Sequence, residues 1–302
     1  MDSRLDSPAR LSASIWRLGT HHLPCFLIKG QDGCALFEVG ISATAPVVLK
    51  QLGHMGVDHG RMKWIIISHA HSDHATGQAG LMEALSSATL LLSSESAEHL
   101  AKPATAGEFA SDDAFTSAAV RRLMGRDGEA PISPPLDLLP DPRQTVEAGQ
   151  ALDLGGVCVE FLGAEGHVPG GLLAWLPNEG TLLASDSAGF CVSGRPAFPL
   201  YFTSYPAYRE NLQAQRALNP KVLALGHQGW FRGPEVGGYL SDLLRHMEKE
   251  HEETLSRLAT GESQEAQVRR LLKRYYKDEL TIFPEKVIAE ACWYLVKRDL
   301  EA

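Results

Sequence analysis

The chain has 302 residues, of which 44% are apolar and 22% charged, so it can bury a hydrophobic core without a disulfide framework. Its 28 basic and 37 acidic residues give a net charge of −9, which disfavours a phosphate backbone as partner and argues against nucleic acid. No apolar run has the length of a signal peptide or a membrane span, and the five scattered cysteines never occur in CxxC spacing. We therefore expect a cytoplasmic protein with reduced cysteines and no membrane partner.

The first half of the chain is predicted to alternate strands with helices. We expect strands at 23–29, 34–39, 63–68 and 89–92, and helices at 45–52, 77–85 and 96–101. An Asp-Gly pair, Asp32 and Gly33, predicts a hairpin between the first two strands. Residues 103–150 are expected to be an insertion or connecting loop. A helix at 112–125 is followed there by a stretch with five prolines that cannot hold a regular element.

Strands and helices recur in the second half, which places the chain in the α/β (α+β) class. Strands are expected at 157–162, 172–176, 181–184 and 222–225, with a helix at 206–218. The character then changes to three charged amphipathic helices, at 239–258, 265–276 and 284–300. These patterns divide the chain into a main domain, 1–235, and a C-terminal helical extension, 236–302. The extension could cap a pocket, form a homodimer surface or simply pack on the main domain.

The segment His69-Ala-His71-Ser-Asp73-His74 follows directly on the strand predicted at 63–68. Four metal-binding side chains within six residues would repel one another and lose solvation unless a cation satisfied them. At an extended strand end His69 and His71 point the same way, and a turn at Ser72 brings Asp73 and His74 to an adjacent position. The segment therefore predicts a metal site.

Three further candidate ligands follow apolar runs and have small neighbours: His167 in AEGHVPGG, Asp186 in LLASDSAG and His227 in LALGHQGW. Loops at strand ends are where sites are assembled, and small neighbours let the backbone approach an ion closely. Taken singly, each residue is as well explained by a surface His or an Asx turn. Together with the first segment they form an ordered set of five His and two Asp.

This ordered set resembles the metallo-β-lactamase-fold hydrolases over about residues 20–235. The matching motifs are HxHxDH at 69–74, GHxxG at 166–170, the aspartate of ASDS and the GH at 226–227. The resemblance implies an αββα four-layer sandwich with the site at one edge of the two sheets. It also implies two divalent metal ions, the first held by His69, His71 and His167, the second by Asp73, His74 and His227, with Asp186 bridging both.

Two departures from the family pattern bear on the substrate. Members often have an early IDTG segment, where this chain has Phe37-Glu38-Val39-Gly40, and residues that grip glutathione in glyoxalase II enzymes have no equivalents here. The long C-terminal helices and the segment CALFEVGIS at 34–42 are similar to a subgroup that includes the quinolone-signal response protein. That subgroup is thioesterase-like and has helices over its site.

The resemblance implies a dinuclear metal-dependent hydrolase of a small ester, thioester or lactone, which uses a hydroxide bridging the two ions. Asp73 is the predicted catalytic residue, since a ligand with a spare oxygen can orient the nucleophile and move a proton to the leaving group. Imidazole with carboxylate suits zinc, iron or manganese, and zinc is the default. The alternatives are a nuclease of the same fold, and a regulatory or binding protein that retains the metal site.

The remaining candidate histidines and aromatic residues are expected to have structural rather than functional roles. His54, His59, His99, His246 and His251 are expected at the surface. A second set of side chains follows the predicted ligands and could touch a substrate, although core packing is the favoured interpretation for any one of them. These side chains are Phe198, Tyr201, Phe202, Tyr205 and Trp230.

Overall fold

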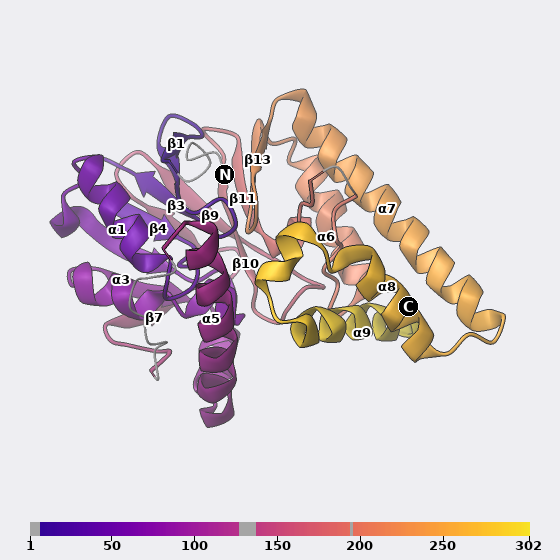
Figure 1. Cartoon of the computed structure of the whole chain (residues 1–302). Coiled ribbons are helices and arrows are strands. Elements are labelled where there is room, and N and C mark those ends of the chain that lie inside the picture. Colours follow the sequence, from indigo (N-terminus) through magenta and orange to yellow (C-terminus); the bar gives the residue numbers. More distant parts are fainter. Residues whose placement is uncertain (1–6, 127–136, 194–195) are drawn as a thin grey trace.

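The computed structural model describes residues 7–126, 137–193 and 196–302. Two β-sheets pack face to face, and helices cover the outer side of each sheet, so the molecule has four layers (Figure 1). This arrangement confirms the predicted αββα sandwich. The two sheets bury an apolar cluster between them, to which both contribute, for example Phe26 and Ile66 from the first sheet and Phe161 and Leu183 from the second.

The first sheet has the strand order β1 to β7. Its strands are β1 (Ala9–Arg10), β2 (Ile15–Gly19), β3 (Pro24–Lys29), β4 (Cys34–Phe37), β5 (Met62–Ile66), β6 (Thr89–Leu92) and β7 (Arg143–Thr145). Neighbours from β1 to β4 are antiparallel, and those from β4 to β7 are parallel. Side chains of β3 alternate between the two faces: Cys25 and Leu27 face the outer helices, whereas Phe26 and Ile28 face the other sheet.

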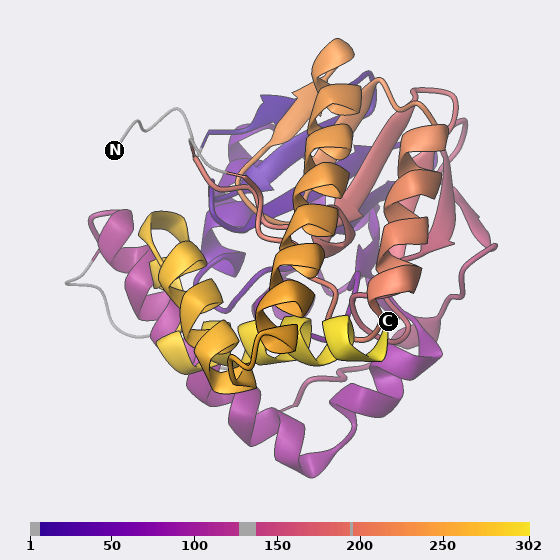
Figure 2. The same ribbon diagram turned by 90° about the vertical axis from the view of Figure 1, so that its right-hand side faces the viewer.

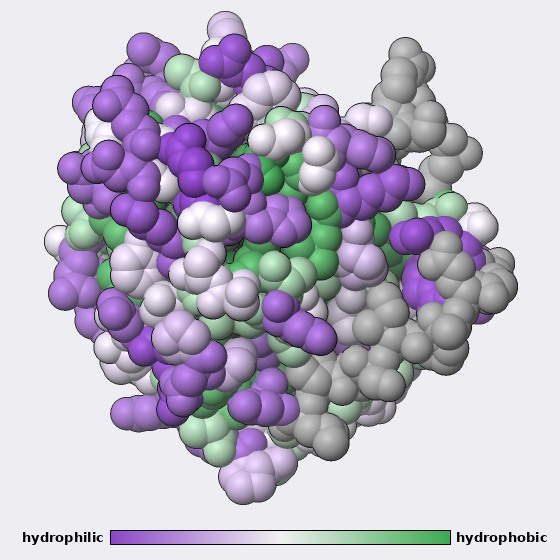
Figure 3. All heavy atoms as spheres, turned by 90° about the vertical axis from the view of Figure 1, so that its left-hand side faces the viewer, coloured by the Kyte–Doolittle hydropathy of each residue, from purple (hydrophilic) through white to green (hydrophobic). Residues whose placement is uncertain are grey.

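The outer face of the first sheet carries α1 (Ala45–His54) and α3 (Gln78–Ala84), with the one-turn helix α2 (Ser72–Ala75) and the short helix η2 (His59–Arg61) in the connections. Helix α1 buries Val48 and Leu52 against the sheet and exposes His54 on the other side. Figure 3 shows that this side of the molecule is largely hydrophilic, with apolar residues exposed in a limited area between the polar ones.

The second sheet has the order β13-β12-β11-β10-β9-β8. Its strands are β8 (Ala151–Asp153), β9 (Cys158–Gly163), β10 (Leu172–Leu176), β11 (Thr181–Ser185), β12 (Val222–Leu225) and β13 (Trp230–Arg232). Strands β11 and β12 are parallel, and the other neighbours are antiparallel. The short helix η3 (Asp186–Ala188) follows β11 directly, so the candidate ligand Asp186 lies at the end of a buried strand.

Helices of the C-terminal half cover the second sheet. They are α6 (Tyr205–Ala217), α7 (Pro234–Ala259), α8 (Gln264–Tyr275), η4 (Asp278–Ile282) and α9 (Glu285–Glu301). Helices α6 and α7 run side by side, and α8 and α9 lie across one end of the layer (Figure 2). The helices expected at 239–258, 265–276 and 284–300 are thereby confirmed. Within the described residues, no helix combines the length and apolar character needed to cross a bilayer.

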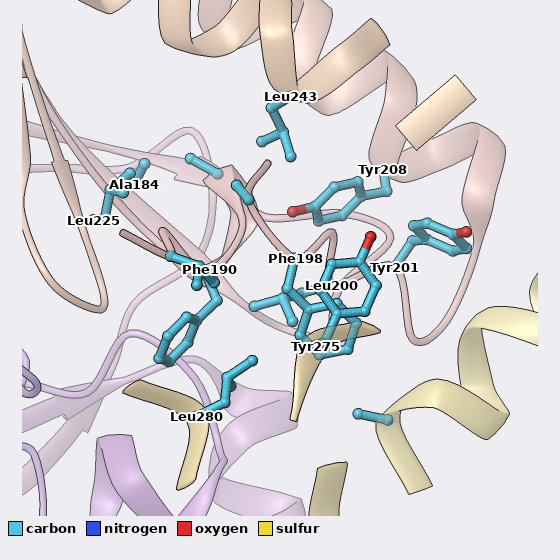
Figure 4. Close-up of a cluster of buried hydrophobic side chains, with 14 of the residues drawn as sticks. Ala184, Phe190, Phe198, Leu200, Tyr201, Tyr208, Leu225, Leu243, Tyr275 and Leu280 are labelled. Carbon is cyan, nitrogen blue, oxygen red and sulfur yellow. The ribbon is translucent and has the colours of Figure 1, made fainter. Parts of the chain in front are cut away.

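The C-terminal helices share one apolar cluster with the second sheet. Leu182 and Leu223 of the sheet, Leu240 of α7, Leu271 of α8 and Leu295 of α9 all belong to it. Figure 4 shows part of this cluster, in which the rings of Phe198 and Tyr275 stack with centroids 4.3 Å apart. The extension therefore packs directly on the sandwich, because its apolar faces and the outer face of the sheet cover each other.

The structure corrects the secondary structure expected over 103–150, which was an insertion or connecting loop with a helix at 112–125. Helix α5 (Pro103–Leu123) follows closely on α4 (Ser94–Leu100), and it begins nine residues before the helix expected at 112–125. Proline is well tolerated at the first helical position, because the N–H it lacks would have no partner there. Strand β7 in the same segment joins the first sheet beside β6. Most of the proline-rich stretch lies at 127–136, outside the described residues.

Candidate metal centre

The predicted ligands come together at one edge of the sandwich, from loops and short helices that follow strands. His69 and His71 follow β5, and Asp73 and His74 lie on α2. The other three follow strands of the second sheet: His167 comes after β9, Asp186 after β11 and His227 after β12. The chain can pass close to the ligands only because of glycine: a Cβ on Gly226 would lie 2.4 Å from Oδ1 of Asp186.

The first group of ligand atoms consists of His69, His71, His167 and Asp186. Nε2 of His69 lies 3.0 Å from Nδ1 of His71 and 3.4 Å from Nε2 of His167. Oδ2 of Asp186 lies 3.6 Å from Nε2 of His167. These are nitrogen and oxygen atoms converging on a common point, which is the arrangement that a cation requires.

The second group consists of Asp73, His74 and His227. Nε2 of His227 lies 3.3 Å from Nε2 of His74 and 3.4 Å from Oδ2 of Asp73. Oδ1 of Asp186 lies 3.2 Å from Nε2 of His227 and 3.4 Å from Nε2 of His74. One carboxylate thus presents one oxygen to each group, and the structure brings all seven predicted residues together.

Hydrogen bonds to the outer nitrogen of each buried imidazole fix the direction of its inner nitrogen. The outer atoms and their partners are Nδ1 of His69 with Ser68 Oγ (2.9 Å), Nδ1 of His74 with Glu38 Oε2 (3.0 Å), Nδ1 of His167 with the Leu200 carbonyl (2.7 Å) and Nδ1 of His227 with the His22 carbonyl (3.0 Å). Such partners hold an imidazole in the tautomer that leaves the inner nitrogen free to bind a metal.

Glu38 is the functional residue that the sequence pattern did not identify. The chain has it at the position of the family's IDTG aspartate, in the segment that departs from the family pattern. Its Oε1 accepts a hydrogen bond from Ser185 Oγ (2.5 Å), and Ser185 Oγ lies 3.1 Å from Ser68 Oγ, the partner of His69. Since Oε2 contacts His74, one buried carboxylate is linked to a histidine of each group. Its position near the end of the strand expected at 34–39 was the one available signal.

The protonation of these groups follows from burial and from neighbouring charges. Burial first, and then the nearby His74, lower the pKa of His69 well below its usual value. For His74 and His227 burial acts in the same direction, but the surrounding carboxylates outweigh it and raise the pKa of both, well above the usual value for His74. Burial alone would raise the pKa of Asp186, yet the imidazoles of His227 and His74 hold it well below its usual range.

The donor set fits a divalent cation. Oδ1 of Asp186 is buried and accepts no hydrogen bond from any described residue, although two imidazole nitrogens lie within 3.4 Å of it. A buried carboxylate oxygen without a donor carries a large desolvation cost, which a bound cation removes. Imidazole nitrogen and carboxylate oxygen are ligands that zinc, iron and manganese accept. The two groups can therefore bind divalent metal.

A cavity of about 410 Å³ lies over this centre. Four predicted ligands reach its floor, namely His71, Asp73, Asp186 and His227. Its walls come from α5, the loop before α6, η4 and α9. Pockets of about 300–1,000 Å³ hold small organic ligands, so a small molecule can reach the candidate metal centre. The C-terminal helices thus contribute to the pocket as well as packing on the sheet.

Of the aromatic residues and histidines outside the ligand set, some line the cavity and others pack in the core. Phe198 and Phe202 line the cavity, whereas the Tyr201 hydroxyl donates to Asp299 and Trp230 lies under the guanidinium of Arg17. His99 is exposed, as expected, but it stands in the cavity wall. His246 and His251 are half-buried, contrary to expectation, and contact Tyr275 and Asp299 in the packing of the C-terminal helices.

Comparison with known proteins assigns the chain to one family. The family model of the metallo-beta-lactamase superfamily matches residues 20–227. The chain is 22% identical over 223 residues to the uncharacterized protein YobT of Bacillus subtilis strain 168, covering 70% of this chain and 84% of that protein. It is 28% identical over 175 residues to a hydroxyacylglutathione hydrolase of Acidiphilium cryptum strain JF-5, covering 56% of this chain and 51% of the relative.

Among solved structures, the metallo-beta-lactamase family protein TTHA1429 of Thermus thermophilus is similar in fold. It has a TM-score of 0.60 at 24% identity, and the match covers 92% of this chain and 89% of that one. At this identity the likeness concerns the fold alone. The family match extends from just before β3 to His227 and includes all seven converging side chains. The chain therefore belongs to the metallo-beta-lactamase superfamily.

Proposed function

We propose that the protein is a metal-dependent hydrolase with a dinuclear centre that cleaves a small carboxylic ester, thioester or lactone. The observation that carries the proposal is the Asp186 carboxylate, which faces both groups of ligand atoms on the floor of the cavity. Members of the superfamily are mostly hydrolases. The relative named as a hydroxyacylglutathione hydrolase supports a thioester among the candidate substrates.

The ligand groups define which residues would hold the metals. His69, His71 and His167 would hold one ion, Asp73, His74 and His227 the other, and Asp186 would contact both. When bound, divalent ions supply Lewis acidity, which lowers the pKa of water and polarises a carbonyl group. Zinc is the ion we expect, with iron and manganese accepted by the same ligands.

Asp73 is the chain's own candidate for proton transfer. Its side chain is 15% exposed, compared with 8% for Asp186, and it lies on the cavity floor. Its Oδ2 contacts His74 and His227 at 3.6 and 3.4 Å, so the carboxylate is held in place. In the proposed reaction Asp73 accepts a proton from the attacking water at its carboxylate and delivers it to the leaving oxygen or sulfur.

The walls of the cavity complete the site by excluding bulk water. Phe190, Phe202 and Phe283 surround the floor of the cavity. Their rings have no hydrogen-bonding atom that could compete with the metal centre for the scissile carbonyl. Exclusion of water strengthens the electrostatic interactions that stabilise developing charge in the transition state. The site is thus suited to acyl transfer to water on a small substrate.

The proposal is tested by assaying protein loaded with zinc, iron or manganese against a panel of thioesters, lactones and aryl esters. We expect turnover that chelation abolishes and added metal restores. Asp186→Ala should lose metal and turnover together, whereas Asp242→Ala, a change at an exposed position of α7, should retain both. Full hydrolysis by metal-free protein would contradict the scheme. Phosphodiester cleavage at low salt without acyl hydrolysis would identify a nuclease instead.

A further inference from the structure

Aromatic rings flank both ligand groups inside the cavity. Phe202 lies over the first group, with its ring centroid 5.0 Å from that of His167 and 6.1 Å from that of His71. On the side of the second group, Phe190 stacks on His227 with centroids 4.7 Å apart, and Phe283 meets the same imidazole edge to face at 5.8 Å. A group bound above the ligands therefore lies between aromatic walls.

Aliphatic side chains of η4 and α9 form part of the cavity wall. Leu280 and Ile288 are buried, and Val287 and Ala291 extend the same apolar lining. Figure 4 shows Leu280 close to Phe190, where the C-terminal helices meet the loop after β11. These side chains have no hydrogen-bonding atoms, so this part of the cavity favours an apolar group over a polar one.

The charged groups of the cavity wall are mostly acidic. Glu108 and Asp112 of α5 face Lys286 and Glu290 of α9, and Nζ of Lys286 lies 3.3 Å from Oδ1 of Asp112. This ion pair neutralises Asp112 and leaves Glu108 and Glu290 in excess. Burial, and then the charge of Lys102, lower the pKa of His99, so that wall residue adds no positive charge at neutral pH. A carboxylate placed beside these two residues, away from the metal-ligand candidates on the floor, meets like charge.

We propose that the cavity selects the acyl part of the substrate, and that this part is an uncharged apolar group about the size of an aromatic ring. The inference depends on the proposed hydrolase function. Phe202, Phe190, Phe283 and the aliphatic residues of α9 hold the group by apolar contact. Glu108 and Glu290 exclude acyl groups that carry a second carboxylate.

The test uses thioesters of N-acetylcysteamine that share one leaving group and differ only in the acyl group: acetyl, benzoyl and 4-carboxybenzoyl. With the zinc-loaded protein we expect kcat/KM for benzoyl to exceed that for acetyl by at least about tenfold, since one buried methylene alone changes the rate by this order. The 4-carboxybenzoyl compound should fall at least about tenfold below benzoyl, because its carboxylate enters an apolar, acidic cavity.

Variants of the cavity wall show whether it causes the preference. Val287→Phe narrows the cavity and should lower kcat/KM for benzoyl about tenfold or more while leaving acetyl within about twofold. Glu290→Gln should raise the rate with 4-carboxybenzoyl relative to benzoyl. Trp293→Ala is the matched control on α9, since Trp293 is 39% exposed and lies outside the cavity lining. It should leave all three values unchanged.

The outcomes separate this inference from the function on which it rests. If none of these thioesters, and none of the lactones and aryl esters of the panel, is hydrolysed while zinc is bound, the proposed hydrolase function fails. If only lactones or aryl esters are hydrolysed, the function stands and the apolar-acyl inference is overturned for thioesters. If acetyl is hydrolysed as fast as benzoyl, or 4-carboxybenzoyl as fast as either, the function stands and the apolar-acyl inference is overturned. A preference for benzoyl that Val287→Phe does not reduce would also overturn it, because the cavity would then not be its cause.

Discussion

Oε2 of Glu38 lies 3.0 Å from Nδ1 of His74 in a fully buried contact between the end of β4 and helix α2. The other oxygen of the same carboxylate accepts from Ser185, next to Asp186. Glu38 therefore joins both sheets behind the ligands. Ser185 adopts a positive φ of 48°, a conformation unusual for serine that points its hydroxyl at this carboxylate.

We predict that Glu38→Gln weakens metal binding. The substitution keeps the shape of the side chain, but its amide cannot accept from both Ser185 and His74, so the orientation of His74 is lost. Metal affinity at the group of Asp73, His74 and His227 should fall about 10- to 100-fold. Competition titration with a chromophoric chelator measures it. Glu98→Gln at an exposed position of α4 is the control, and equal affinities for both variants would contradict the role given to Glu38.

A second prediction concerns Asp113, which is fully buried on α5. Its carboxylate accepts from the Ser42 backbone N–H (2.8 Å), from the Ser42 hydroxyl and from Thr76 Oγ1 (2.5 Å), two residues after His74. Asp113→Ala would leave the buried Ser42 backbone N–H without this acceptor. It would also remove an acceptor from both hydroxyls, of which that of Thr76 still lies 2.8 Å from the Ser72 carbonyl. The free energy of unfolding should drop by about 3 kcal/mol, measured by urea denaturation. Ser111→Ala, exposed on the same helix, should change it little.

The dependence of metal binding on pH follows from the pKa shifts. In the metal-free protein the carboxylates around His74 and His227 raise the pKa of both above the usual value, so both retain protons to higher pH. A metal needs their inner nitrogens deprotonated, so its affinity should rise as pH increases through the neutral range, with release of protons on binding. His69 and His71 have lowered pKa values and should release none near neutrality.

Calorimetric titration in buffers of different ionisation enthalpy measures this proton release. It should be larger below neutral pH than well above it, where His74 and His227 are already deprotonated. A metal affinity that is constant or falls with rising pH would show that these two residues are not ligands.

Much of the fold follows from local sequence patterns. The strands predicted at 89–92, 172–176 and 222–225 agree with the structure residue for residue, because short apolar runs bounded by turn residues are the signature of buried strands. Strands β1, β2, β7, β8 and β13 were not predicted. Most of these strands are short, and β7 and β8 have exposed side chains, so their pairing with neighbours rather than their composition makes them strands.

The candidate site could be predicted where its residues form a compact motif. His69 to His74 lie within six residues, and the other three ligands stand in recognisable turns. Glu38 and Ser185 could not be assigned a role, because only tertiary packing brings them behind the ligands. The residues that line the cavity could not be predicted from the sequence either. Val287 and Ala291 lie on one face of an amphipathic helix, and the periodicity does not show which neighbouring element that face contacts.

The metal content per chain shows whether two ions bind between the seven converging side chains. After loading with zinc and removal of free metal, elemental analysis should find close to two ions per native chain and close to one in His227→Ala, with His99→Ala remaining at two. Native protein that retains no zinc, or a His227→Ala variant with the same zinc content as the native chain, would show that these side chains do not hold two ions.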